Sequence, residues 1–178
     1  MNWCNVDESL SNTIVMLKTE FARNNGGGSH IQEAIPTSSS STLPINNDDL
    51  NMLHRFAESN SIYSSSSELE ILGIPCKVYQ GDVNNFWLDS IKHDTSYAPF
   101  YPIWILSAYA LALYSKNLGI NEVIDIGSGD GRIAYCAKLT GMTSHGIEID
   151  ENLVSLQKSI SSHTGVEFNA GMADATQF

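Results

Sequence analysis

A short apolar segment followed by three glycines at alternate positions constrains this chain more than any other feature of its sequence. Residues 123–126 have the sequence VIDI, and residues 127–132 continue as GSGDGR. The β-branched side chains favour a strand, the glycines a tight turn, and the residues that follow a helix. A strand, a glycine turn and a helix N-terminus in this order let the backbone approach a nucleotide-like ligand closely.

The sequence after the turn alternates between helical and extended patterns. We expect a helix over 132–140 ended by Gly141, a strand over 143–149, a helix capped by Asp150 that runs to about Ser162, and a strand over 166–170. Such alternation predicts an α/β fold with a parallel sheet and crossover helices.

Two acids mark the ends of the first two predicted strands. Asp125 comes two residues before the first glycine, and Glu148 ends the second strand about twenty residues after the turn. An acid in the second position can accept hydrogen bonds from two ribose hydroxyls. For Asp125 the alternative is a local role, since aspartate readily bonds nearby backbone in a turn.

The glycine spacing departs from the fingerprint of nicotinamide-binding folds. With Gly129 as the first glycine of G-x-G-x-x-G, the last position is Ala134; with Gly127 as the first, it is Arg132. A nicotinamide-dependent oxidoreductase is therefore disfavoured, although it stays an alternative.

The pattern D-x-G-x-G-x-G, starting at Asp125, resembles motif I of the class I S-adenosylmethionine (SAM) dependent methyltransferases. This resemblance covers residues 97–178 and implies a Rossmann-like domain, of which the chain holds the first three strands. It implies that SAM is the cofactor, with Asp125 near its ammonium group, Glu148 on its ribose and Ile149 against its adenine. The turn residues that would line the cofactor are Gly127, Ser128, Gly129 and Gly131.

Finer features are similar to one branch of that family. The sequence GDGRI over 129–133 and the Tyr97-x-Pro99 element resemble lysine methyltransferases of the ATP synthase c-subunit type. The resemblance implies a protein acceptor with lysine as a candidate, but small-molecule methyltransferases carry GDGRI too. The third motif of the family contains an acid after the third strand. Counting along the predicted strand puts Met172, followed by Ala173, at that position, whereas the local sequence matches the motif at Asp174. We favour Asp174. No catalytic base is nominated, and methyl transfer needs no metal.

The N-terminal half divides into two predicted parts. Residues 1–45 contain a helix over 7–23 and a Gly/Ser-rich linker, and residues 46–96 form a small α+β cap. Within the cap we expect a helix over 48–59, a hairpin around Gly73 and a short helix over 83–91. An apolar helix over 103–114 is expected to lie buried between two layers. Four aromatic residues before or within it are either a pocket wall or packing: Tyr97, Phe100, Tyr101 and Trp104.

Composition limits the partners of the chain. A net charge of −11 without a basic patch argues against nucleic-acid binding, and no apolar run is long enough to span a membrane. Three distant cysteines and five scattered histidines favour free thiols in a cytoplasmic protein without a metal site. The methyl acceptor, a protein or a small molecule, is the expected partner.

The chain ends shortly after its third predicted strand. We therefore expect an open apolar sheet edge in a fragment or truncated product, whose own activity is in question. A non-catalytic protein that binds SAM or a partner remains an alternative to an active methyltransferase.

Overall fold

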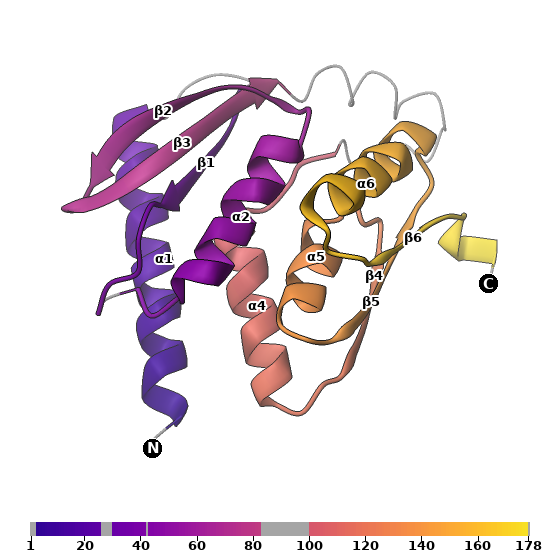
Figure 1. The fold of residues 1–178 in the computed structure, drawn as a ribbon, viewed down its shortest axis with the longest axis horizontal. Helices are drawn as coiled ribbons and strands as arrows, with labels where there is room; N and C mark the ends of the chain where they lie inside the picture. The colour runs from indigo at the N-terminus through magenta and orange to yellow at the C-terminus, as the bar shows by residue number, and fades with distance from the viewer. Residues whose placement is uncertain (1–2, 26–29, 42, 83–99, 178) are drawn as a thin grey trace.

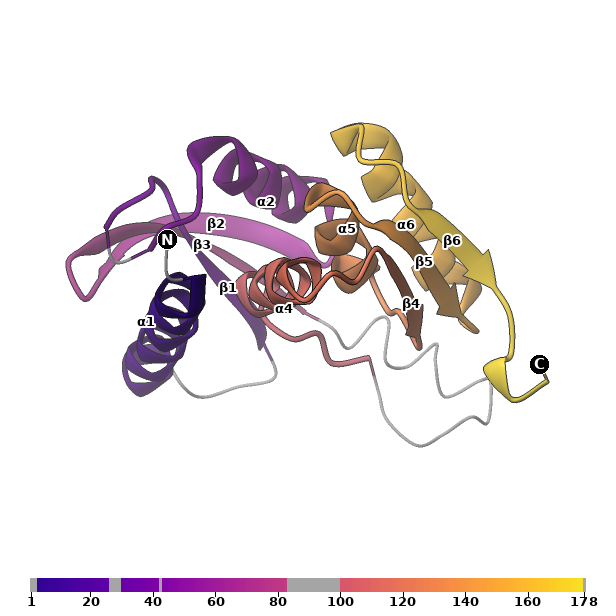
Figure 2. The ribbon, with the colours of Figure 1, turned by 90° about the horizontal axis from the view of Figure 1, so that it is seen from below.

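Two three-stranded sheets, one antiparallel and one parallel, organise the chain in a computed structural model that describes residues 3–25, 30–41, 43–82 and 100–177. The antiparallel sheet has the order β1-β3-β2 and the parallel sheet the order β4-β5-β6. Helices α2 and α4 lie between the two sheets in both views (Figures 1 and 2). One hydrophobic core includes residues from both halves, from Leu10 to Phe168.

The antiparallel half confirms three of the predicted elements. Its elements are α1 (Trp3–Asn25), β1 (His30–Pro36), α2 (Asn47–Ser59), β2 (Tyr63–Ile71) and β3 (Ile74–Asp82). Both helices bury the residues whose spacing predicted them, such as Leu17 and Leu53. The hairpin turns through Leu72 and Gly73, which both have positive φ, as the twist of a two-residue hairpin favours.

Strand β1 lies inside the segment that the sequence predicts to be a flexible linker, so that prediction is wrong for residues 30–36. This strand pairs with β3 from His30↔Asp82 to Pro36↔Cys76. Ile31 and the four residues over 33–36 are buried. The glycines and serines on either side hide this short strand in the sequence. A boundary after residue 45 therefore separates β1 from the sheet to which it belongs.

The parallel half has the β-α-β-α-β order of a Rossmann-like fold, which confirms the predicted α/β class. Its elements are α4 (Ile105–Asn117), β4 (Glu122–Ile126), α5 (Arg132–Leu139), β5 (Thr143–Glu148), α6 (Glu151–Thr164), β6 (Asn169–Met172) and the 3₁₀ turn η2 (Ala175–Gln177). Strand β6 starts three residues later than predicted, because Val166 and Phe168 pack into the core before it. As predicted, Asp150 caps α6, accepting hydrogen bonds from the amides of Asn152 and Leu153 at 2.8 and 3.3 Å.

One face of the parallel sheet exposes apolar side chains. Helices α5 and α6 pack on the face that contains Ser144 and Gly146 of β5. On the opposite face, Ile124 and Ile126 of the edge strand β4 are 60% and 66% exposed. Exposed apolar groups on an edge strand are the feature that the sequence predicts for a three-stranded parallel sheet.

Helix α4 lies between the two sheets, as the sequence predicts, but one of its sides is exposed. Ile105, Leu106 and Tyr109 are buried, whereas Leu111 and Tyr114 are 51% and 52% exposed. An apolar composition on every face does not ensure that every face of the helix is covered.

Two predicted features fall where the structure gives no description. The helix expected over 83–91 and the Tyr97-x-Pro99 element lie outside the described residues. Among the helices that are described, none combines the length and apolar character that crossing a bilayer requires.

We expect the exposed and buried isoleucines to differ sharply in their effect on folding. Ile105→Ala should lower the free energy of unfolding by about 2–5 kcal/mol, because it leaves a cavity in the core. Ile126→Ala should change it by less than about 0.5 kcal/mol, because its side chain contacts mainly solvent. Urea unfolding followed by circular dichroism measures both. A large loss for Ile126→Ala would mean that another surface covers this face in solution.

Candidate functional site

The glycine turn lies at the carboxyl end of β4 and is fixed to the neighbouring strand by backbone hydrogen bonds. The amides of Gly127 and Ser128 both donate to the carbonyl of Ile147, at 2.8 and 3.1 Å. Gly127, Gly129 and Gly131 have φ angles of +74°, +56° and +80°, a region that favours glycine. The turn therefore needs glycine for its backbone conformation at all three positions.

The three glycines differ in what surrounds them. A Cβ at Gly131 would lie 2.8 Å from the Gln157 side chain, and one at Gly129 would lie 2.5 Å from the Phe100 ring. A Cβ at Gly127 would meet nothing within 4 Å. Gly131 and Gly129 thus allow close packing inside the protein, whereas Gly127 faces open space in which a ligand can approach the backbone.

Glu148 holds the turn with its carboxylate. One oxygen accepts from the amide of Gly129 at 2.8 Å, and the other from the amides of Ile149 and Asp150 at 2.8 and 3.1 Å. A carboxylate offers about four acceptor positions, so three are used here. In this structure Glu148 organises the backbone around the turn, and the described residues use three of its acceptor positions.

Gln157 of α6 holds the same turn from the other side. Its side-chain amide donates to Ser128 Oγ at 2.9 Å and to the carbonyl of Gly129 at 2.8 Å. Together with Glu148, it binds both backbone polar groups of Gly129. The sequence analysis missed Gln157, because on the sequence it is one polar residue in an amphipathic helix.

Asp125 is a half-buried carboxylate without a hydrogen bond among the described residues. Burial is the main cause that raises its pKa to about 6, and the nearby carboxylates of Asp130 and Glu148 add to the rise. Because the structure leaves this charge uncompensated, Asp125 is suited to receive a cationic group.

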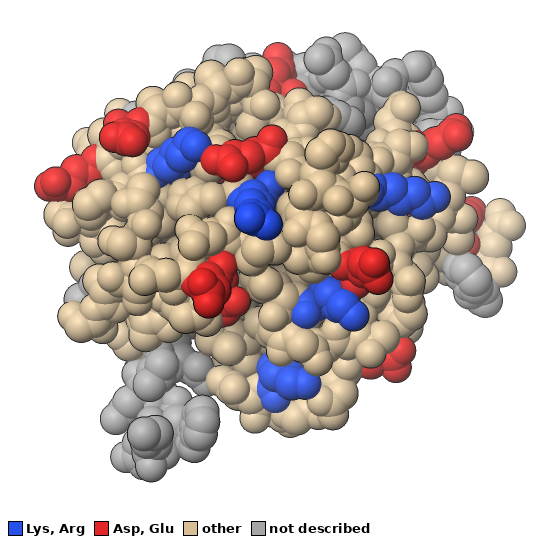
Figure 3. All heavy atoms as spheres, in the orientation of Figure 1, with Lys and Arg blue, Asp and Glu red and all other residues tan. Residues whose placement is uncertain are grey.

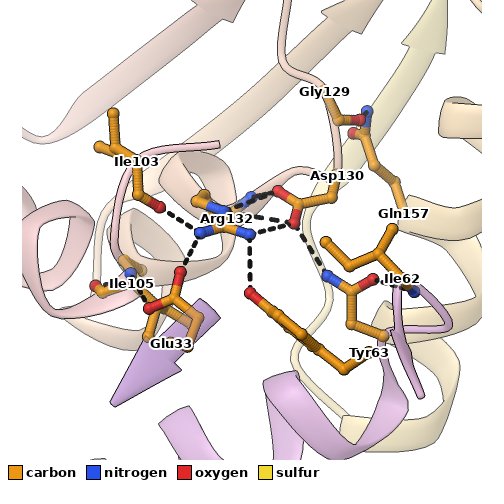
Figure 4. A network of polar contacts seen from close by, with 11 residues as sticks. Glu33, Ile62, Tyr63, Ile103, Ile105, Gly129, Asp130, Arg132 and Gln157 are labelled. Carbon is orange, nitrogen blue, oxygen red and sulfur yellow. Dashed lines mark hydrogen bonds and ion pairs between the residues drawn. The ribbon is translucent and has the colours of Figure 1, made fainter. Parts of the chain in front are cut away.

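Arg132, the first residue of α5, forms a buried network that joins the turn to the N-terminal half (Figure 4). Its guanidinium is 3% exposed and contacts Glu33 of β1, the Ile103 carbonyl, the Tyr63 hydroxyl at 3.2 Å and Asp130. Burial raises the pKa of Glu33, and the Arg132 charge and the Ile105 amide partly oppose that rise.

Asp130, between the second and third glycines, is fully occupied by this network. Its carboxylate accepts from Arg132 Nε at 2.9 Å, from Arg132 Nη2 at 2.6 Å and from Asn60 at 2.8 Å. Glu33 and Asn60 could not be found from the sequence, because Glu33 lies 99 residues from Arg132 and Asn60 lies 70 residues from Asp130. The only signal for this network in the sequence was the motif GDGR over 129–132.

The third-motif candidates lie in different surroundings. Met172, the last residue of β6, pairs in register with Glu148, and the amide of Ala173 donates to the Glu148 carbonyl at 3.0 Å. Asp174 is partly exposed and accepts from the amide and hydroxyl of Thr176 at 2.9 and 2.7 Å, which lowers its pKa. Strand register therefore puts Met172 beside Glu148, while the Asp174 carboxylate bonds within its own turn.

The predicted aromatic cluster separates into different environments. Trp104 is buried against Phe21 of α1, with ring centroids 5.6 Å apart, and therefore packs in the core. Phe100 lies over Gly129, and Tyr101 is 82% exposed. Tyr97 lies outside the described residues. Phe100 is thus the described member of the cluster that contacts the turn.

A basic patch and a cluster of metal ligands are two further features that would indicate a binding site in the described part of the chain. On the face shown in Figure 3, acidic and basic side chains are interspersed and the described Lys and Arg residues form no patch. No group of three or more His, Cys, Asp or Glu side chains among the described residues is arranged to hold a metal ion.

Comparisons with known proteins find structural likeness only. No protein-family model matches the chain, and no curated protein matches it. Among solved structures, TehB from Haemophilus influenzae is 17% identical with a TM-score of 0.34, over 57% of this chain and 32% of TehB. A Pyrococcus horikoshii protein provisionally assigned as an RNA methyltransferase is 20% identical with a TM-score of 0.36, over 51% of this chain and 50% of that one. The matched region thus spans half or less of these proteins, and the fold class rests on the strand order described above.

Proposed function

We propose that this chain binds SAM at the glycine turn as part of a SAM-dependent methyltransferase. The observation that carries this proposal is an uncompensated, half-buried carboxylate, Asp125, beside the open backbone of Gly127. Both lie at the carboxyl edge of a parallel sheet, the usual position for ligands in open α/β folds.

The charges around the turn favour SAM over a dinucleotide. SAM carries a sulfonium and an ammonium group, and either cation would stabilise the ionised form of Asp125. The pyrophosphate of a nicotinamide cofactor would instead meet the Asp125 carboxylate with like charge. Asp130 does not alter this comparison, because Arg132 already pairs with it.

The other expected contacts fit this ligand to different degrees. Glu148 has one acceptor position for a ribose hydroxyl. A second position opens only if the ligand displaces one of the three backbone amides that donate to Glu148. Ile149 follows Glu148 directly and is proposed to contact the adenine. The Asp174 carboxylate already accepts bonds from Thr176, and the Met172–Ala173 position, which pairs in register with Glu148, is the alternative contact to the adenine.

Bound SAM would supply an electrophilic methyl group that an acceptor displaces in line. The contribution of this chain is then to hold the donor rigidly at a turn fixed by Glu148 and Gln157, since alignment accounts for much of the catalysis of such a step. A protein acceptor, with lysine as a candidate, is proposed because an acidic chain tolerates basic partners.

A chain that binds SAM without transferring methyl groups is the second candidate. Among the described residues at the turn, Glu148 and Asp130 hold backbone or Arg132, and Asp125 is assigned to the cofactor. A lysine acceptor needs a base, and none of these three carboxylates is free to serve. Radiolabelled methyl transfer to cell extract distinguishes the two candidates.

Cofactor affinity should depend on pH through Asp125. The ammonium group binds the carboxylate form, so raising the pH from 5 to 7 through a pKa of about 6 should tighten SAM binding by about tenfold. Asp125→Asn should bind SAM more weakly and lose this pH dependence. Calorimetric titrations with SAM, its demethylated product and NAD measure these affinities. The absence of SAM binding by the unaltered chain would refute the proposed function.

The same substitution should make the fold more stable. The folded pKa of Asp125 lies above the ordinary value of 3.8, so stability is lost as the pH rises through about 6. Asp125→Asn avoids that loss and should raise the free energy of unfolding at pH 7.5 by about 1–2 kcal/mol, a figure reduced for partial solvent screening. At pH 3.5 the gain should vanish. Equal stabilisation at both pH values would contradict a buried charge as its cause.

Gly127→Ala should separate ligand contact from backbone strain. Gly165, at the end of α6, offers a matched control because its φ is +75° against +74° and its Cβ also meets nothing within 4 Å. Both alanine variants should lose about 1 kcal/mol of stability from positive φ. Only Gly127→Ala should also weaken SAM binding, by about 1–3 kcal/mol, because its methyl group enters the ligand's space. Equal SAM affinity in both variants would exclude Gly127 as a cofactor contact.

A further inference from the structure

We propose that the N-terminal antiparallel sheet sets the geometry of the glycine turn, with Glu33 of β1 as a positioning residue that acts through Arg132 and Asp130. The part of this inference that concerns affinity rests on the proposed function. The part that concerns the turn itself stands on the contacts of the buried network alone.

The first step is the dependence of Arg132 on partners from the N-terminal half. The guanidinium is buried, so its charge must be compensated by groups that reach it. Besides Asp130 next to it in the turn, those groups are Glu33 from β1, Tyr63 from β2 and the carbonyl of Ile103 before α4 (Figure 4). Arg132 can therefore occupy its place only when the N-terminal sheet is in position.

The second step is that Arg132 and Asn60 fix the residue between two left-handed glycines. Asp130 is 1% exposed, and each of its carboxylate oxygens accepts from the Arg132 side chain. Asn60, directly after α2, adds a hydrogen bond of 2.8 Å. Because Gly129 and Gly131 leave the backbone little intrinsic preference, the anchored side chain of Asp130 selects its conformation.

The third step is that Glu33 joins two helices with one carboxylate. One oxygen pairs with Arg132 of α5, and the other accepts from the amide of Ile105, the first residue of α4, at 2.9 Å. A glutamine replaces one of the two carboxylate oxygens by an NH2 group, which donates and cannot accept, so in the same position it satisfies only one of these two donors. Glu33→Gln therefore leaves Arg132 or the end of α4 unsatisfied and shifts the guanidinium toward Asp130.

A purely structural network and a positioning network predict different results. If the network only holds the two halves together, Glu33→Gln lowers the global stability and leaves the turn of the folded molecules unchanged. If it positions the turn, the turn loosens within the folded state. By linkage, a ligand at the turn then protects β1 in return.

The test measures amide hydrogen exchange and SAM affinity in the full chain. Glu33→Gln should speed exchange at Gly129 and Gly131 by about tenfold relative to Ile160 in α6, and weaken SAM binding by about fivefold or more. Ile35→Val is the matched control, because it alters a buried core side chain two residues along the same strand that has no polar group to bond Arg132. It should leave the exchange ratio and the affinity at their original values. Asn60→Ala, which removes one bond to Asp130 and keeps the ion pairs, should give a smaller change in the same direction.

The outcomes separate the two proposals. Unchanged turn exchange in folded Glu33→Gln and Asn60→Ala, relative to the control, overturns the positioning role whether or not SAM binds. Faster turn exchange together with no SAM binding by the unaltered chain supports the positioning role and refutes the proposed function. Faster turn exchange with unchanged SAM affinity overturns the claim that the sheet sets affinity.

Discussion

The compensation of one buried guanidinium is the interaction on which the arrangement of this molecule depends. Arg132 is the first residue of α5, directly after the glycine turn, yet two of its four partners, Glu33 and Tyr63, come from the antiparallel half. An arginine cannot lose its charge inside a protein, so burial requires that carboxylates and carbonyls surround it. The two sheets, α4 and the glycine turn therefore have one relative arrangement in which this charge is stable.

The carboxylates near the turn differ in role: two stabilise the structure, and one is proposed to bind the ligand. Asp130 compensates Arg132, and Glu148 binds three backbone amides, so both are largely satisfied by the protein. Asp125 has no such partner among the described residues, and its burial raises its pKa. An ionisable group that the fold leaves unsatisfied is where a ligand gains most from binding, which is why Asp125 carries the functional proposal.

Local pattern predicted the fold well where apolar spacing and turn residues agreed. The helices α1, α2 and α6, the hairpin at Gly73 and the Rossmann-like strand order follow from spacing that neighbouring residues share. Strand β1 was missed because flanking Gly and Ser runs suggested a linker, and its pairing partner β3 lies more than forty residues later. The exposed side of α4 was missed because composition does not report whether a covering layer exists.

For the site, the sequence by itself determined the turn, its acids and its place at the end of a parallel strand, because glycine spacing and strand-end position are local properties. Only the tertiary structure decided what each acid does. It assigned Glu148 to backbone amides, Asp130 to Arg132 and Asp174 to its own turn, and it gave Asp125 no partner in the described part of the chain. It also brought Glu33, Asn60 and Gln157 to the turn. The physical reason is that hydrogen bonds and charge compensation act through space, between residues whose separation along the chain leaves no periodic signal.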